Sequence, residues 1–529
     1  MRQLKKLLIV CLCMGLSSLT YGQVRNVNGR VTDADTGNPI ENVQVIVDDS
    51  DIFTKTNTSG QFSIAVPENS SLALRFYHPD FEEVVKALGG RSEIQVALFS
   101  NIRYNQYGAR VERNRLFPEE RNGILVLESQ DRGYRIWLDA RANVDGAAFF
   151  GDTYNDIGNG TSIRRARFAI KSQFNKNWYG EFDIDVANSE LELKDAYVEY
   201  NNLKGLSFKV GNYKEVFSAE RATTSRYTQF IERPNVANAL APSRTIGAGV
   251  QYNKNWFLGY GGVHFQNVDD LEERLFSKDA NKDFGIDEGY SLTGKIVAMP
   301  WYKDLTRGLH IALAGSYRTP KTSAEVIGST RFDTRSLSSI NRKKYMDTDD
   351  ITSVDHTVLG NVELGGYYKN LRFHSEFMMA DVHRLDEMPT ERFNGFFVQG
   401  AVLLFGGNYV YNTGEGEYTQ SVRGKKWGDI DLAFRYDYLN LNSRGEGNIM
   451  GGAGEGYTFG INYYANYNVK ISLNYAYLNH DRYATGKNKL FVGYNEAGEL
   501  TTNGMSVVDP EGTAGEDFHM IAVRFEVAF

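Results

Sequence analysis

The amino-acid sequence predicts an all-β protein, a 16-stranded antiparallel transmembrane β-barrel preceded by a small seven-stranded β-sandwich. Two observations carry this prediction. From residue 133 to the C-terminus, segments of about ten residues alternate apolar or aromatic side chains with polar ones, the period of a barrel strand with one face in lipid. After the first 22 residues, no run of 18 apolar residues occurs, so a membrane-spanning helix is not expected.

Residues 1–22 have the features of a secretory signal peptide. Arg2, Lys5 and Lys6 precede a short apolar run from residue 7 to residue 16, and cleavage is expected before Gln23. The predicted mature chain is therefore exported.

The composition of the mature chain argues against several kinds of partner and site. The only two cysteines, Cys11 and Cys13, lie in the signal peptide, so neither disulfides nor thiolate metal sites are expected. From residue 23 onward there are 55 basic and 66 acidic residues, a formal net charge of −11. Nucleic acid is not an expected partner, because no basic excess exists to displace counterions from phosphates.

Residues 23–98 are predicted to form the sandwich. Short alternating segments are separated by turn signals such as the run Asp35-Thr36-Gly37-Asn38-Pro39. The pattern Gly29-x-Val31-x-Asp33, followed by Gly37-x-Pro39-Ile40 and Ser59-Gly60-x-Phe62, resembles the carboxypeptidase-regulatory-like domain. The resemblance implies a periplasmic accessory module without catalysis, either purely structural or docked to a periplasmic partner.

Residues 99–132 are predicted to be a linker with alternating charges and no clear period. Within it, residues 124–127 form an apolar run that fits either a short strand or a plug-like contact.

Sixteen alternating segments are predicted within residues 133–529, and their links fall into two classes. The tight, polar links lie at 175–177, 201–205, 253–255, 369–371 and 466–468, and the long links lie at 142–161, 213–243, 264–289, 319–357, 441–456 and 480–517. If the N-terminus is periplasmic, the tight links all fall on the periplasmic side, which is typical of outer-membrane barrels. Two links depart from this rule, because 188–191 is short and 405–427 is long.

Ordered pieces of this region resemble the phosphate-selective porin O and P family. Among them are the runs Ser162-Ile163-Arg164-Arg165-Ala166-Arg167, Val210-Gly211-Asn212-Tyr213, Phe230-Ile231-Glu232-Arg233-Pro234 and Trp427-Gly428-Asp429-Ile430. The resemblance implies a homotrimer in the bacterial outer membrane, with outer-membrane lipid and small anionic or polar solutes as partners. It also implies a constriction formed by the third outer loop, here 213–243.

The resemblance further implies that lumen arginines and lysines draw phosphate-like anions inward, since guanidinium binds phosphate through paired hydrogen bonds. The candidate pathway residues are Arg164, Arg165, Arg167 and Lys171 on the second barrel strand, Arg221, Arg226 and Arg233 in the constriction loop, and Arg244 at its foot.

The residues themselves leave the selectivity of this pathway open. A hairpin centred on 175–177 places Lys171 opposite Glu181 and Arg167 opposite Asp185. Such pairs, each contributing about 0.2–1 kcal/mol, would brace the wall and neutralise its field. Together with the net charge of −11, this pairing leaves two alternatives, which are a general or cation-leaning porin and an anion-preferring porin.

Other functions fit the sequence less well. No H-E-x-x-H or G-x-S-x-G motif occurs, so neither catalysis nor a metal or cofactor site is expected. His374, beside Arg372 and Glu376, is interpreted as a lumen residue with polar partners. An energised transporter would need a plug and 22 strands, which the 397 residues from 133 onward do not accommodate. A structural or adhesive barrel with a closed lumen stays open.

Overall fold

The structure is a computed structural model that describes residues 24–67, 72–111, 115–268, 288–320, 328–340, 343–443, 449–481, 483–485, 487, 489–508 and 515–529. The predicted signal peptide lies outside the described residues. The chain separates into two compact units, Met1–Arg115 and Leu116–Phe529.

The first unit contains the predicted seven-stranded sandwich. A three-stranded sheet has the order β4-β1-β7, and a four-stranded sheet has the order β3-β2-β5-β6. Alternate side chains of the strands are buried and form one apolar core, to which Val31, Phe62 and Leu74 belong. The strands are β1 (Val24–Asp33), β2 (Gln44–Val47), β3 (Phe53–Lys55), β4 (Gln61–Pro67), β5 (Ala73–Tyr77), β6 (Val84–Ala87) and β7 (Glu93–Leu98), and the small pair β8 (Arg103–Tyr104) and β9 (Arg110–Val111) follows them.

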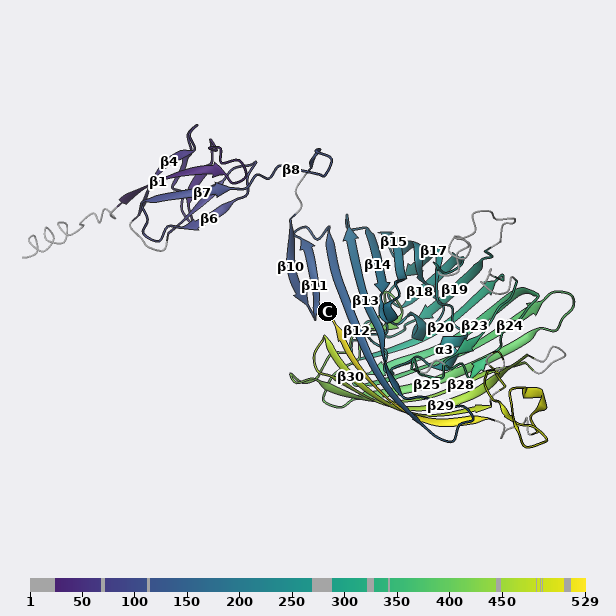
Figure 1. The fold of residues 1–529 in the computed structure, drawn as a ribbon. Helices are drawn as coiled ribbons and strands as arrows, with labels where there is room; N and C mark the ends of the chain where they lie inside the picture. The colour runs from purple at the N-terminus through teal and green to yellow at the C-terminus, as the bar shows by residue number, and fades with distance from the viewer. Residues whose placement is uncertain are drawn as a thin grey trace, which may run out of the picture. The chain divides into compact units, whose positions relative to one another are not determined.

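In the second unit, sixteen described strands form a closed antiparallel barrel, which confirms the predicted fold class (Figure 1). The first wall strand, β12 (Arg135–Phe150), pairs with both β13 and the last strand, β33, so the sheet closes on itself. The other wall strands are β13 (Gly160–Phe174), β14 (Trp178–Asp185), β15 (Glu192–Leu203), β16 (Leu206–Lys214), β17 (Arg244–Asn253), β18 (Phe257–His264), β19 (Ser291–Ala298), β20 (Arg307–Arg318), β23 (Val354–Tyr368), β24 (Leu371–Arg384), β25 (Glu391–Leu403), β28 (Asp429–Ser443), β29 (Ile449–Tyr464), β30 (Val469–Asp481) and β33 (Glu516–Ala528).

Shorter elements lie in the links between the wall strands. They are η1 (Ala187–Ser189), α2 (Ala219–Ala222), α3 (Asn235–Ala239), η3 (Gly504–Ser506) and the strand pairs β21 (Asp333–Thr334) with β22 (Met346–Asp347), β26 (Tyr411–Asn412) with β27 (Glu417–Tyr418), and β31 (Gly493–Tyr494) with β32 (Leu500–Thr501). Among the described residues, no helix is both long enough and apolar enough to cross a membrane.

Two wall strands are longer than the sequence pattern predicted. β12 continues to Phe150, although the link was expected to begin at 142, and β29 begins at Ile449 rather than near 457. Both extensions are rich in alanine and glycine, as in the run Gly451-Gly452-Ala453-Gly454. Small side chains show little alternation between apolar and polar residues. The sheet pairing nevertheless continues through both extensions, with a register shift at Gly451 and Gly452.

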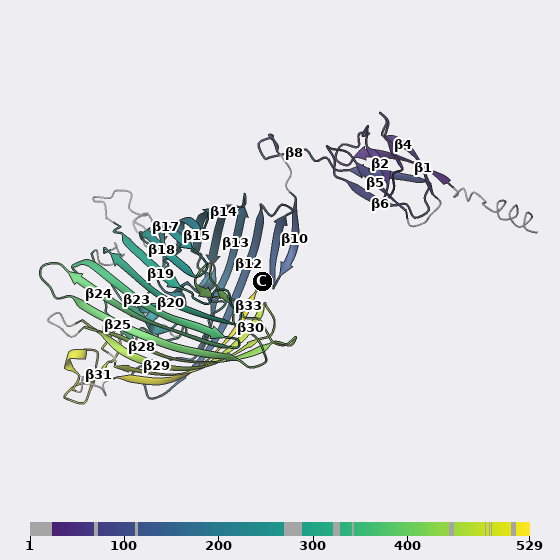
Figure 2. The ribbon, with the colours of Figure 1, turned by 180° about the vertical axis from the view of Figure 1, so that it is seen from behind.

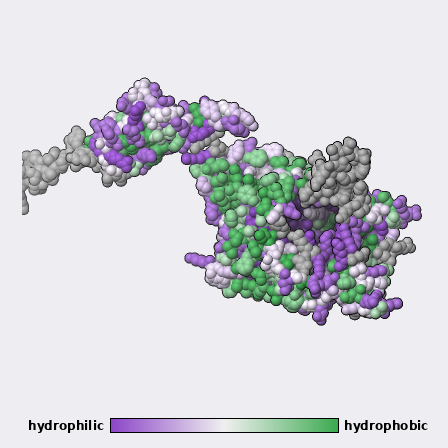
Figure 3. All heavy atoms as spheres, in the orientation of Figure 1, coloured by the Kyte–Doolittle hydropathy of each residue, from purple (hydrophilic) through white to green (hydrophobic). Residues whose placement is uncertain are grey.

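The outer face of the barrel is apolar, as Figure 3 shows for one side. Phe168 and Ile170 of β13 are exposed outward, whereas Ala169 between them is buried. At the end of the barrel with the short links, here called the turn end, rings gather on the outside. Trp178 lies against Tyr200, with ring centroids 4.7 Å apart. An apolar band bounded by aromatic rings is the surface that a barrel presents to lipid.

Part of the predicted linker is a hairpin of the barrel sheet. β10 (Leu116–Arg121) and β11 (Ile124–Ser129) are joined by Asn122 and Gly123, whose φ angles of 50° and 85° suit a tight hairpin turn. β11 pairs with residues 135–138 of β12, and β33 pairs with residues 141–150 of the same strand. β11 therefore continues the line of β33 beyond the C-terminus, which Figure 2 marks close to the label of β33.

Candidate functional site

Loop 215–243 folds into the barrel from the end opposite the turn end. Phe217 of this loop and Val236 of α3 are buried in an apolar core with inward side chains of β23, β24, β25 and β28, such as Met378 and Phe397. Phe332 and Met346, from the link between β20 and β23, join the same core. The lumen beside these strands is therefore packed with side chains.

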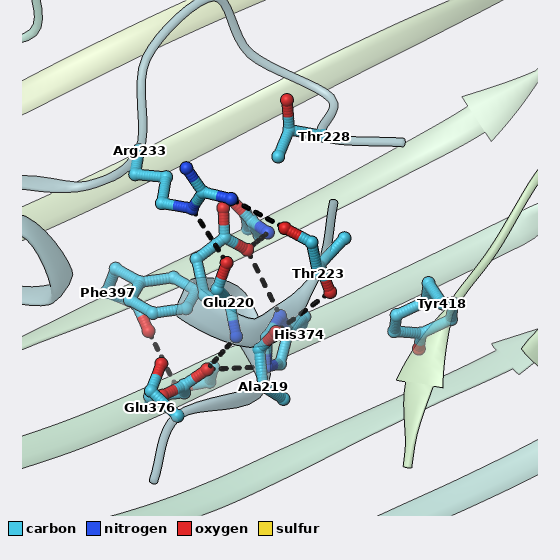
Figure 4. Close-up of polar contacts among 12 residues, drawn as sticks. Ala219, Glu220, Thr223, Thr228, Arg233, His374, Glu376, Phe397 and Tyr418 are labelled. Atoms are coloured by element: carbon cyan, nitrogen blue, oxygen red, sulfur yellow. Dashed lines mark hydrogen bonds and ion pairs between the residues drawn. The ribbon is translucent and has the colours of Figure 1, made fainter. Parts of the chain in front are cut away.

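Helix α2 of this loop is anchored to the wall by buried polar groups (Figure 4). The backbone N–H of Ala219 donates to Glu363 at 3.1 Å, and that of Glu220 donates to Glu376 at 2.7 Å. The His374 imidazole lies between two carboxylates, 3.1 Å from Glu376 and 3.5 Å from Glu220. Its surroundings fit the interpretation of a lumen residue with polar partners.

Glu220 carries a stable negative charge in this anchor. Burial by itself would raise the pKa of its carboxyl. The hydrogen bond and charge of His374, with the charges of Arg233 and Arg372, have the larger effect and lower this pKa to about 2. The guanidinium of Arg233 donates from Nε to the Glu220 carbonyl oxygen at 2.9 Å. Charged groups on α2 and on β24 therefore hold the loop in place.

Loop 404–428 enters the barrel from the turn end. Tyr418 donates its hydroxyl to the carbonyl oxygens of Gly366 at 2.7 Å and Phe373 at 2.9 Å, and the Arg372 guanidinium lies 3.7 Å from its ring centroid. The sequence showed that this link is unusually long. Nothing in the pattern showed that it turns inward.

Between these two loops and the wall formed by β12–β17 lies a cavity of about 490 Å³. Four predicted pathway residues line it, namely Arg167, Lys171, Arg226 and Arg244. Within the described part of the chain, the other four, Arg164, Arg165, Arg221 and Arg233, lie outside this lining.

Two of the lining residues form the cross-strand pairs that the turn at 175–177 predicted. Arg167 lies opposite Asp185 and Lys171 lies opposite Glu181. The Arg167 Nε atom donates to Asp185 at 2.9 Å, and the Lys171 Nζ atom lies 3.5 Å from the Glu181 carboxylate. A third lining residue, Arg244, donates from Nε to Asp195 at 3.1 Å.

Arg164 and Arg165 both belong to the lumen because β13 carries a bulge. The pairing with β12 shifts between Asn143 and Val144, so two consecutive side chains are placed on the inner face. Arg164 donates from Nε to Glu232 in loop 215–243 at 2.7 Å. Arg165 is 4% exposed, and its Nε and Nη1 atoms have no hydrogen-bond partner among the described residues.

The three predicted loop arginines bind uncharged oxygens. Arg221 donates to the Asn238 side chain at 3.2 Å, and Arg226 donates to the Tyr467 carbonyl oxygen at 3.0 Å. Burial, with the neighbouring charge of Arg233, lowers the pKa of Arg221 to about 9. These side chains brace the loop, and Arg221 keeps its charge at neutral pH.

Sequence reasoning found only part of an acidic row that faces the basic residues. It consists of Glu181 and Asp183 on β14 and Asp195 and Glu199 on β15, and all four line the cavity. Carboxylate oxygens of the first three lie within 4.8 Å of one another. Alternation within residues 181–185 indicated the inward acids of β14. Which acids of β15 lie beside them depends on a register shift at Asp183 and residue 184, and alternation does not reveal this shift.

Two protein families match separate parts of the chain. The family described as phosphate-selective porin O and P matches residues 134–498, and the carboxypeptidase regulatory-like domain matches residues 26–101. Both matches confirm the resemblances found in the sequence. An uncharacterized protein of Caulobacter vibrioides is 24% identical over 330 residues, which are 61% of this chain and 64% of that protein. The chain thus spans about 64% of the length of this relative.

Several solved porin-like structures are similar at low identity. The anion-selective porin from Comamonas acidovorans is 11% identical with a TM-score of 0.43, covering 75% of this chain and 100% of that one. The outer-membrane protein OmpT of Vibrio cholerae is 9% identical with a TM-score of 0.44, covering 75% of this chain and 98% of that one.

Proposed function

Because this chain belongs to the phosphate-selective porin O and P family, we propose that it is an outer-membrane porin through which small hydrophilic solutes diffuse passively. One observation carries the proposal most directly. The barrel is closed and apolar outside, and its inner wall faces a cavity of about 490 Å³ lined mainly by charged and hydroxyl-bearing side chains. A polar passage inside a lipid-facing wall is what diffusion across a membrane requires.

As an outer-membrane porin, the chain has each of its parts on a defined side of the membrane. The barrel lies in the outer membrane, and the sandwich, with any docking partner, lies in the periplasm. Three copies assemble side by side, as the family resemblance implies. The turn end carries the shortest links, such as 175–177 and 254–256, which supports its placement on the periplasmic side.

A structural or adhesive barrel is the second candidate function. One observation favours it, because the apolar core around Phe217, Met378 and Phe397 fills the lumen beside β23–β28. The two candidates differ in a single property, which is whether ions cross the protein.

Single-channel recording of the purified full-length protein in planar lipid bilayers tests the proposal. We expect stepwise conductance in potassium chloride. Folding is monitored in the same sample by the mobility shift that a closed barrel shows on a gel when it is heated. Folded protein without conductance would overturn the porin function and support the structural barrel.

A further inference from the structure

The charged side chains around the cavity are balanced in sign. A passage that concentrates anions carries an excess of basic groups on its walls, because their summed field attracts the ion. Here seven basic residues meet seven acidic ones. The basic residues are Arg141, Arg167, Lys171, Lys209, Lys214, Arg226 and Arg244, and the acidic residues are Asp139, Glu181, Asp183, Asp195, Glu199, Glu415 and Glu417.

One of these acids is partly neutral at physiological pH. Burial, followed by the charge of Glu415, raises the pKa of Glu417 to about 8. Protonation of Glu417 removes one negative charge, so the numbers of basic and acidic groups stay within one of each other.

The balance of basic and acidic groups is a property of the β12–β17 wall, because the acidic row lies on its two middle strands, β14 and β15. Asp183 of β14 lies directly opposite Asp195 of β15, and both residues are buried. Like charges that face each other across two strands destabilise a sheet. The row is stable only if cations lie on both of its sides.

The first set of cations comes from β13. The Arg167 Nη1 atom lies 3.7 Å from Asp183, and the Lys171 Nζ atom lies 3.5 Å from Glu181. Both cations also contact a second carboxylate, Asp185 for Arg167 and Asp139 for Lys171, at 2.9 Å and 3.6 Å. Arg167 and Lys171 of β13 are therefore matched by acids on the neighbouring strands.

The second set of cations comes from β16 and β17. The Lys209 Nζ atom lies 3.1 Å from Glu199 and 4.4 Å from the ring centroid of Tyr197. Arg244 binds Asp195 through two nitrogen atoms. Each acid of the row thus has a cation within 4 Å on one side or the other.

Such a wall discriminates by the charge of the solute. Opposite charges about 4 Å apart attract each other by about 4 kcal/mol at the effective dielectric of a protein surface, so a free anion must compete with a resident carboxylate for each guanidinium. A solute that carries donors and acceptors together binds both members of a pair without separating them. Hydroxyls of Tyr179 and Tyr197, which donate to Glu181 at 3.1 Å and 3.0 Å, add uncharged groups to the same surface.

We infer that the passage admits small polar solutes without net charge, such as zwitterions and polyols, and has no preference for phosphate-like anions. This inference rests on the proposed porin function and specifies its substrate class. The anion selectivity implied by the family resemblance stays a prediction, and the measurements below decide between the two.

Reversal potentials of the full-length protein under a potassium chloride gradient give the first test. We expect a chloride-to-potassium permeability ratio within about twofold of one. A ratio above about ten, in either direction, would overturn the inference and leave the porin function intact. Absence of conductance would instead contradict the porin function itself.

Two double variants test whether the acidic row sets this balance. Glu181→Gln with Asp183→Asn removes two negative charges, and we expect the ratio to rise severalfold toward chloride. Lys171→Gln with Lys209→Gln removes two positive charges, and we expect an equal shift toward potassium. Asp517→Asn, on the outward face of β33, is the matched control and should leave the ratio unchanged. If neither double variant moves the ratio, the row does not line the conducting path and the inference fails.

Solute uptake gives an independent measurement. Vesicles that contain the protein are challenged with glycine, glucose or inorganic phosphate. We expect glycine and glucose to enter the vesicles at rates set by their size. We also expect that added phosphate leaves the chloride conductance of the protein unchanged. Saturable block of chloride conductance by phosphate would show an anion-binding passage and overturn the inference.

Discussion

Arg524 of the last wall strand and Asp145 of the first lie directly opposite each other and form a two-pronged ion pair across the seam of the barrel. Both nitrogen–oxygen distances are 2.7 Å, and the two side chains are 2% and 3% exposed. The remaining Arg524 nitrogen, Nη1, donates to the Ile231 carbonyl oxygen of loop 215–243 at 2.6 Å. One guanidinium therefore joins barrel closure to the position of the inner loop.

Replacing Asp145 by Asn should destabilise the closed barrel by up to about 3–5 kcal/mol, because the buried guanidinium loses its two-pronged ionic partner and retains the more distant Glu232, 3.4 Å away. The urea concentration at which the heat-modifiable gel band is lost measures the effect. Asp381→Asn is the control, since its partner Arg392 is 75% exposed and such pairs contribute about 0–1 kcal/mol. Equal unfolding midpoints for the two variants would contradict this account.

The strands and part of the wall chemistry were readable from sequence because both depend on local pattern. Alternation located the starts of β14, β15 and β16 at the residues observed, and a three-residue turn fixed the register that pairs Lys171 with Glu181. A strand period and a turn length are properties of neighbouring residues, so no tertiary information is needed.

The rest of the site depends on bulges and on long-range packing, which alternation does not encode. The bulge that brings both Arg164 and Arg165 into the lumen appears only when β13 is paired with β12. The inward course of loop 404–428 depends on Tyr418 reaching carbonyl oxygens more than forty residues away. Likewise, the sequence gives no sign that Glu220 differs from an exposed loop acid, because its contact with His374 joins residues far apart in the chain.

An arginine placed on the outer face of the wall should be far more harmful than one on the inner face. Val210 of β16 is 56% exposed outward, and its neighbour Lys209 lines the cavity. Val210→Arg should cost up to about 2–4 kcal/mol, because a cation would meet lipid. Lys209→Arg keeps a cation facing the lumen and should be tolerated. The yield of heat-modifiable barrel in lipid vesicles measures both, and equal yields would mean that this face of β16 does not contact lipid.

Gly123→Ala should loosen the hairpin of β10 and β11. An added Cβ at φ +85° is strained by about 1–2 kcal/mol, and it would lie 2.5 Å from the Asn468 amide, which donates to the carbonyl oxygens of Gly123 and Ala528. Hydrogen exchange of residues 116–129 should become faster. Gly498→Ala is the control, because Gly498 has φ +76° but no atom near the added Cβ. Faster exchange of the hairpin in the control alone would refute the contact with Asn468.

Acid should release loop 215–243 through the protonation of Glu220. Its pKa is lowered from 4.5 in the unfolded chain to about 2 in the barrel, so the ionised carboxylate stabilises the docked loop above pH 4.5. That contribution, about 3 kcal/mol at most, is lost as the pH falls from 4.5 toward 2. Single-channel traces should therefore be steady at pH 5 and should fluctuate increasingly below pH 4.

Glu220→Gln keeps an acceptor for Gln399, which donates to Glu220 at 2.9 Å. This variant removes the titrating group, so its traces should not change across the same window. If both proteins respond to acid in the same way, the loop is held by other groups, and the ion pair of Arg164 with Glu232 becomes the next to test.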